Sequence, residues 1–132
     1  SLNTLCIICK FKNSIVISPG GIFSPRSTAF YGQESVRIIR RFRANKAFIS
    51  ASGYELTLGL TCSLIEDAPH KQAMIKSSKD KILLIDSTKF GKVSTRVFAK
   101  IEDFTTVITD SGIADEYARQ IESNNVRLII AS

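Results

Sequence analysis

The residues of this chain that are best suited to bind a ligand follow four short apolar stretches. Their side chains are mostly Gly, Ser, Thr, Asp and Lys, and they occupy Pro19–Gly21, Ser50–Gly53, Asp86–Lys89 and Thr109–Gly112. Asp accepts hydrogen bonds from sugar hydroxyls, while Lys and backbone N–H groups bind phosphate. Turns prefer the same residue types, so ordinary turn chemistry is an equally good interpretation of the residues alone.

Three cysteines and one histidine raise the question of a metal or redox site. Cys6 and Cys9 have a C-x-x-C spacing, but a structural zinc site needs four ligands, and only Cys62 and His70 remain, far along the chain. We therefore expect no metal and no cofactor. Cys6 and Cys9 are predicted to be small apolar side chains in a packed segment.

The chain has a net charge of +6. Its densest run of basic residues consists of Arg37, Arg40, Arg41, Arg43 and Lys46. Such a run is typical of a nucleic-acid-binding surface. Phe42 and Phe48 fall on apolar positions, however, so no aromatic side chain is expected among the bases for stacking. A solvated helix face or a subunit contact is the favoured interpretation.

The elements that must position these residues alternate between two periodicities. Apolar or β-branched runs predict strands at 14–18, 46–51, 81–86, 105–110 and 126–131. Helical spacing predicts helices over 36–42, 66–79 and 114–121, with Asp67 capping the second, and 24–28 is expected to be a loop. Apolar strands that alternate with helices indicate an α/β fold, a mostly parallel sheet with helices on both faces. Ligands bind beyond the carboxyl ends of such strands, where the four polar segments lie.

Composition limits the class of protein. Hydrophobic residues make up 44% and charged residues 23% of 132 residues, which is typical of one globular domain spanning 1–132. No apolar run approaches the roughly 18 residues of a membrane span, and the first residues do not resemble a signal peptide. We expect a cytoplasmic protein without a membrane partner. Because the chain begins with Ser1, we also expect it to be part of a longer protein.

Several motifs, in the same order, resemble the effector domain of DeoR-type bacterial transcriptional repressors over nearly the whole chain. The strongest is Asp86-Ser87-Thr88-Lys89-Phe90-Gly91, which matches the family's D-S-[ST]-K-F-G. The other matching segments are Ile17–Gly21, Tyr31–Gly32, Asn45–Tyr54, Gly59–Thr61, Asp67–Ile75 and Ile108–Ile113.

The resemblance implies a fold similar to ribose-5-phosphate isomerase and the coenzyme A transferases, and a domain that senses phosphorylated sugars without turning them over. It implies a homo-oligomeric repressor of a carbohydrate-utilisation operon, in which the effector alters operator DNA binding by a separate winged helix-turn-helix domain. The implied ligand-binding residues are Ser50, Ser52, Gly53, Lys71, Asp86 and Lys89, with Gly20 and Gly21 as a phosphate loop or a turn.

The chain departs from the family's pattern in two places. Ser50 and Ser52 stand where the family has a glycine and an acid, and Tyr54 replaces a smaller residue and is expected to narrow the cleft. By this resemblance, we expect the winged helix-turn-helix, the first strands of the sheet and one phosphate loop to lie outside this sequence. We expect their absence to expose a sheet edge and an apolar face, to favour oligomerisation or strand exchange, and to weaken ligand binding.

Two alternatives remain open. A sugar-phosphate isomerase or acyltransferase on the same fold would need a general base and an acid, for which Asp86, Glu66 and Lys71 are candidates. The sugar-facing loop carries serines where isomerases use paired acids, which disfavours that alternative. A plain oligomerisation module that binds no ligand would use the arginine-rich helix as its interface.

Overall fold

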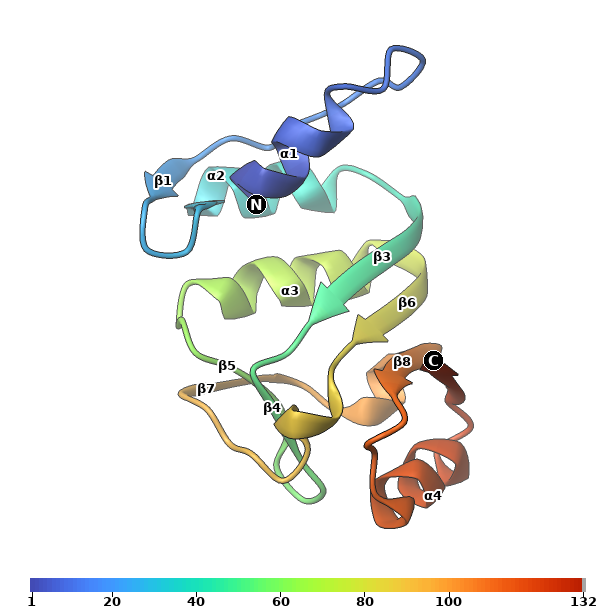
Figure 1. Cartoon of the computed structure of the whole chain (residues 1–132). Helices are drawn as coiled ribbons and strands as arrows, with labels where there is room; N and C mark the ends of the chain where they lie inside the picture. Colours follow the sequence, from blue (N-terminus) through green and yellow to red (C-terminus); the bar gives the residue numbers. More distant parts are fainter. Residues whose placement is uncertain (132) are drawn as a thin grey trace.

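A computed structural model of the chain describes residues 1–131 and has a four-stranded parallel sheet at its centre (Figure 1). The strands are β3 (Ala44–Ser50), β6 (Ser78–Leu84), β8 (Thr106–Asp110) and β9 (Arg127–Ala131), in the order β3-β6-β8-β9. Helix α3 (Asp67–Lys76) connects β3 to β6 through a small second sheet, and α4 (Asp115–Ser123) connects β8 to β9. The predicted α/β fold with a mostly parallel sheet is confirmed.

One face of this sheet forms the hydrophobic core. The register aligns Ile49 with Leu83 and Leu83 with Val107, and all three side chains are buried. The core also contains Ile75 of α3 and Ile121 of α4. Both helices therefore pack on the same face, and Leu83 of β6, between β3 and β8, is fully buried there.

The opposite face and the β3 edge are far more open. Phe48 and its diagonal neighbour Leu84 are 56% and 41% exposed. β3 is the first strand of the sheet, so only one of its edges is paired. An open edge and an apolar face were both expected from the sequence.

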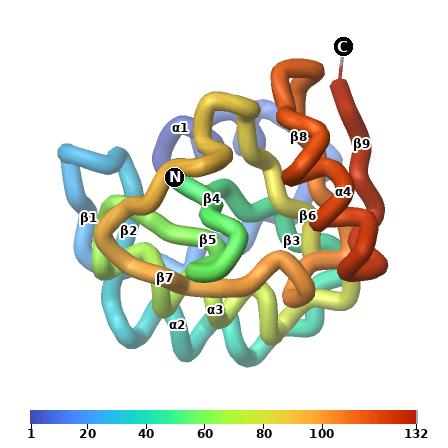
Figure 2. Tube along the Cα trace, turned by 90° about the horizontal axis from the view of Figure 1, so that it is seen from below, coloured from blue at the N-terminus to red at the C-terminus, as the bar shows by residue number. Residues whose placement is uncertain are grey.

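A three-stranded antiparallel sheet lies below the core and was not predicted. Its strands are β4 (Gly53–Glu55), β5 (Gly59–Cys62) and β7 (Arg96–Ala99), each too short to show a periodicity. Leu60, Cys62 and Phe98 from this sheet are buried in the core. Figure 2 shows β7 crossing beneath α3, with α4 and β9 at the far end of the molecule.

The first third of the chain forms a peripheral layer. Helix α1 (Leu2–Ile8) is followed by a long extended segment, the hairpin β1 (Ile22–Ser24) and β2 (Ala29–Tyr31), and helix α2 (Gln33–Arg40), which packs on α3. Gly20 and Gly21 turn the chain into the hairpin with φ angles of 66° and 116°. A Cβ on Gly21 would lie 2.4 Å from the Tyr31 carbonyl oxygen, so only glycine fits beside β2.

Three local predictions in this part of the chain are wrong. Residues 14–18 are not a strand, because no strand pairs with them, and Ile15 is 94% exposed. Cys6 and Cys9 are exposed rather than packed, because α1 buries none of its residues. Phe42 lies beyond the end of α2 and is 46% exposed, because the helix stops at Arg40 and the turn directs the ring outward.

Two boundaries also differ from the sequence prediction. Glu66 rather than Asp67 occupies the N-cap of α3, and it makes no side-chain capping hydrogen bond. β6 begins at Ser78, three residues earlier than expected, because the polar segment Ser78–Asp80 pairs with the start of β3. Within the described residues, no helix is both long enough and apolar enough to cross a bilayer.

Candidate functional site

Lys71 and Ser50 meet at the carboxyl end of β3. Lys71 is the fifth residue of α3, and its Nζ donates to the Ser50 carbonyl oxygen at 2.5 Å, with Ser50 Oγ 3.4 Å away. Asp67 Oδ2 lies 3.6 Å from the same Nζ, and the Phe98 ring centroid lies 5.3 Å from it. The ammonium group is thus held at the strand end by an acid, a carbonyl and an aromatic face. The ammonium group therefore lies at the strand end where the sequence predicted a ligand.

Ser52 and Gly53 are near this point but have mainly structural contacts. Ser52 Oγ accepts a hydrogen bond from the Ser63 N–H at 3.2 Å. Gly53 is buried, and a Cβ there would lie 2.3 Å from the Lys92 carbonyl oxygen. The turn between β3 and β4 is therefore pressed against the segment that follows η1 (Ser87–Lys89).

Asp86 and Lys89 lie at the carboxyl end of the neighbouring strand β6. Asp86 caps the 3₁₀ helix η1, where its Oδ1 accepts hydrogen bonds from the N–H and hydroxyl of Thr88. The Thr88 hydroxyl lowers the pKa of Asp86, and the positive charge of Lys89 adds to the effect. Lys89 is half-buried at the end of the same turn. These two residues form a second cluster beside the Lys71–Ser50 contact.

Asp110 at the end of β8 joins this second cluster, and the sequence analysis did not select it individually. Its Oδ2 accepts from the Ser87 N–H at 2.7 Å and its Oδ1 from the Gly112 N–H at 2.9 Å. The Ser87 side chain is the largest cause of a low pKa at Asp110, and these two backbone N–H groups add to it, so that the pKa is about 2. The signal was present in the sequence, since an acid followed by Ser-Gly directly ends an apolar strand. Asp110 positions η1, and hence Asp86 and Lys89.

Replacing Asp110 by Asn is expected to lower the melting temperature at neutral pH. The folded-state pKa is about 2 and the ordinary value is 3.8, so the carboxylate stabilises the fold fully above pH 4. That stabilisation is lost as the pH falls through 2, where the group becomes protonated in both states. Thermal unfolding of wild type and D110N should therefore converge between pH 4 and pH 2. A difference that is constant over that range would contradict this role.

Tyr54 does not narrow the cleft, which corrects the sequence expectation. It is 1% exposed, stacks edge-on against Phe90 and Tyr117, and its hydroxyl hydrogen-bonds to Gln120. Burial raises the pKa of this phenol to about 12. The large ring is accommodated because the core extends between β4 and α4.

A cavity of about 710 Å³ lies between β3, α3 and the N-terminal layer. Ser50 and Lys71 line it together with Phe48, Met74, the segment 16–19 and residues of α1. Ser52, Gly53, Asp86, Lys89, Gly20 and Gly21 are not among its lining residues. The structure thus brings two of the predicted ligand-binding residues to one cavity. It places the others at the same sheet edge, in the adjoining turns, or in the turn before β1.

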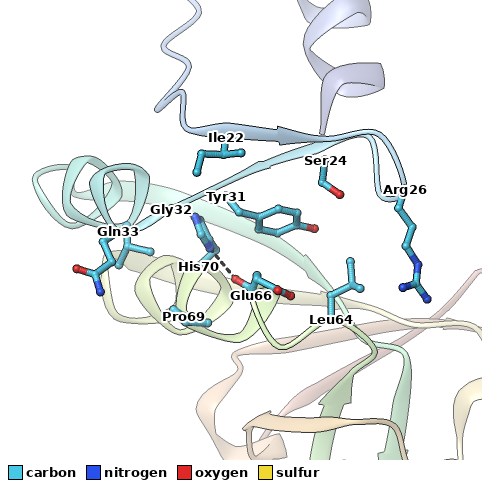
Figure 3. A pocket seen from close by; sticks show the side chains of 11 residues that line it. Ile22, Ser24, Arg26, Tyr31, Gly32, Gln33, Leu64, Glu66, Pro69 and His70 are labelled. Atoms are coloured by element: carbon cyan, nitrogen blue, oxygen red, sulfur yellow. Dashed lines mark hydrogen bonds between the residues drawn. The ribbon is translucent and has the colours of Figure 1, made fainter.

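A second cavity of about 530 Å³ adjoins the first and lies between the β1–β2 hairpin and the starts of α2 and α3. Figure 3 shows the rings of Tyr31 and His70 between the hairpin and α3, with Arg26 at the far end. His70 Nε2 lies 2.6 Å from Ser35 Oγ, and Nδ1 lies 2.9 Å from the Glu66 carbonyl oxygen. Because both ring nitrogens are engaged, His70 forms a wall between the two cavities. Tyr31, His70 and Leu64 line both.

Comparison with models of protein families identifies the family of this chain. The family model for the DeoR C-terminal sensor domain matches residues 1–111, which include the two cavities, η1 and Asp110. The chain belongs to the DeoR C-terminal sensor domain family. The segment outside the match holds α4 and β9, which complete the parallel sheet.

Curated relatives of this DeoR sensor domain are bacterial transcriptional regulators. The uncharacterised HTH-type regulator YulB of Bacillus subtilis is 32% identical over 89% of this chain and 45% of its own length. IolR of the same organism is 28% identical over 99% of the chain and 52% of its own length. The deoxyribose operon repressor of Escherichia coli is 26% identical over 98% and 51%. The chain thus spans about half the length of the curated relatives it matches.

Proposed function

We propose that this DeoR sensor domain binds a phosphorylated sugar in the larger cavity and passes the binding event to the rest of a transcriptional repressor. The observation that carries the proposal is Lys71, which lines that cavity and whose ammonium lies 2.5 Å from the Ser50 carbonyl oxygen. A phosphate group is a stronger partner for an ammonium than a neutral carbonyl is. Ser50 Oγ, on the same wall, is a hydrogen-bonding group for a sugar hydroxyl.

The contact also supplies a mechanism for sensing. When Lys71 turns toward phosphate, it releases the carbonyl at the end of β3, where the chain enters the turn to β4. That turn packs through Gly53 against Lys92, and η1 carries Asp86 and Lys89 just before it. The ligand thereby shifts the strand-end turns as a group. Coupling of this kind is commonly about 1–3 kcal/mol between two sites.

The names of relatives support a sugar-derived effector. Besides the deoxyribose operon repressor, an L-fucose operon activator from Haemophilus influenzae is 29% identical over 90% of the chain. We propose that the intact regulator controls a carbohydrate operon, acts as a homo-oligomer and contacts its operator through a separate DNA-binding domain. We further propose that the effector is bound and released unchanged, since the carboxylate of Asp86 is engaged by Thr88 as the cap of η1.

The test is thermal unfolding of the chain with a panel of sugar phosphates. A ligand present at about 100 times its dissociation constant should add roughly 2.7 kcal/mol of stability. Lys71→Gln should remove the shift, and Lys89→Ala should reduce it. The matched control is Lys92→Gln, an exposed lysine three residues beyond Lys89.

Two results would count against the proposal. One is a shift in the wild type that Lys71→Gln leaves unchanged, since the phosphate would then lie elsewhere. The other is the absence of any shift across the panel for both this chain and an intact DeoR regulator that contains it. That result would favour a domain that serves only for oligomerisation.

A further inference from the structure

A dense group of cations gathers at the amino edge of the parallel sheet, away from the proposed effector site. Helix α2 leads directly into β3 and α3 into β6, so the ends of both helices and the starts of both strands lie together (Figure 1). This basic edge consists of Arg40, Arg41, Arg43, Lys46, Lys76, Lys79 and Lys81.

The basic edge carries the whole net charge of the chain. Segments 40–46 and 76–81 hold seven of the eighteen Lys and Arg residues but only one of the twelve acids, Asp80. The remaining eleven bases and eleven acids balance, so the net charge of +6 is localised here. This is a concentrated positive field rather than a generally basic surface.

The cations are exposed and free of carboxylate partners. Apart from Lys81, which is half-buried, all are exposed, and among residues 1–131 the ion pairs are Arg37–Glu34 and Lys71–Asp67, neither of which involves the basic edge. Arg43 Nη1 donates to the Lys76 carbonyl oxygen at 3.3 Å, which fixes the turn after α2 onto the end of α3. The negative ends of two helix dipoles help to hold the cations there.

Phe42 removes the sequence-based objection to a polyanion partner. Its ring was expected to be buried, but it is exposed between Arg41 and Arg43. The exposed ring leaves the flanking arginines free to face a partner, and contact with a duplex phosphate backbone needs only such cations and no base stacking.

We propose that the basic edge binds the phosphate backbone of duplex DNA without regard to sequence. Lys79 and Lys81 alternate with Asp80 along β6 and therefore share one face of the sheet, next to Lys76 at the end of α3, while Lys46 lies opposite Asp80 on the other face. Duplex DNA offers a matching density, with one negative charge per about 1.7 Å of its axis. A second copy of this chain is a poor partner, because like charges would face each other across a symmetric contact.

The position of the basic edge allows both ligands to bind at once. β3 begins at the basic edge with Ala44 and ends at Ser50 beside Lys71. Seven residues of strand separate the two sites by roughly 20 Å. The proposal does not depend on the identity of the effector, or on whether one binds.

The experiment measures fluorescence anisotropy of a labelled duplex of arbitrary sequence with this chain. If four phosphates are neutralised, affinity should fall about 100-fold between 50 and 200 mM salt. The variant R40Q/R41Q/K76Q/K79Q should bind at least about tenfold more weakly at low salt, with a shallower salt dependence. The control K10Q/K12Q/K92Q/R119Q has the same net charge and alters only exposed side chains, so it should stay within about twofold of wild type.

Three outcomes would overturn the proposal. The first is an equal loss of affinity in both quadruple variants, which would reflect net charge alone. The second is no binding of the duplex by the wild-type chain at 50 mM salt. The third is binding to phosphatidylglycerol vesicles but not to the duplex, which would make an anionic membrane the partner. Circular dichroism of all three proteins verifies that the substitutions leave the fold intact.

Discussion

Replacing Leu83 by Ala is expected to lower the free energy of unfolding by about 2–5 kcal/mol. Leu83 is fully buried near the carboxyl end of β6, with Ile49 on one side in register and Val107 on the other. The three strands and two helices around it form one packed cluster, which leaves little freedom to collapse into the cavity. A domain of this size is stable by only about 5–15 kcal/mol, so this single change removes a large share of its stability.

The matched control is Leu84→Ala, the next residue on the same strand. Leu84 points to the open face and is 41% exposed, so truncation should cost less than about 1 kcal/mol. Urea unfolding followed by circular dichroism compares the two variants directly. If L84A cost as much as L83A, the open face would be buried in solution. The apolar face would then be an interface between copies, and sedimentation would reveal the oligomer.

Replacing Gly53 by Ala is expected to destabilise the fold by about 1–3 kcal/mol or more and to displace the turn that follows η1. The new Cβ would lie 2.3 Å from the Lys92 carbonyl oxygen and 3.1 Å from the Thr61 hydroxyl. Both obstacles are held in place, since Thr61 Oγ1 accepts from the Ser94 N–H at 2.9 Å. Overpacking a rigid backbone contact of this kind commonly costs about 1–3 kcal/mol or more.

Gly20→Ala provides the comparison for G53A. Gly20 has a φ of 66°, but a Cβ there meets nothing within 4 Å. Only the left-handed backbone opposes the substitution, at a cost of about 1 kcal/mol. Comparing the melting temperatures of G53A and G20A separates the effect of a steric clash with the Lys92 backbone from the effect of backbone strain at a positive φ. Equal melting temperatures would mean that the β3–β4 turn yields, and that Gly53 has no special steric role.

The strands of the central sheet were predictable because their side chains are apolar throughout. Residues 46–51, 105–110 and 126–131 were assigned within two residues of β3, β8 and β9. Residues 14–18 have the same β-branched character, but a strand also needs a partner, and composition alone does not reveal whether one is present. The short antiparallel strands β4, β5 and β7 were missed because three or four residues do not establish a period.

The site was predictable as a location more than as a set of contacts. The rule that ligands bind at the carboxyl ends of parallel strands selected Ser50, Asp86 and the turn after β8 correctly as neighbours at one edge. The family pattern pointed to Lys71. The contact between Lys71 and Ser50 links the residue that the family pattern selected to one that the strand-end rule selected. Sequence did not reveal that Gly53 is fixed by the Lys92 backbone, because that approach comes from a segment about forty residues away.

The parallel order of the central sheet also bears on how the chain acquires its structure. Ala44 pairs with Ser78, Ile82 with Thr106 and Thr106 with Arg127, so no two strands of this sheet are joined by a tight hairpin. Each pairing must wait until a long crossover connection has closed, which makes assembly non-local and slow. During synthesis, β6 leaves the ribosome before β8 exists to pair with its second edge. Until β8 has been synthesised, the nascent chain therefore exposes an unpaired edge of β6, and an unpaired strand edge promotes aggregation.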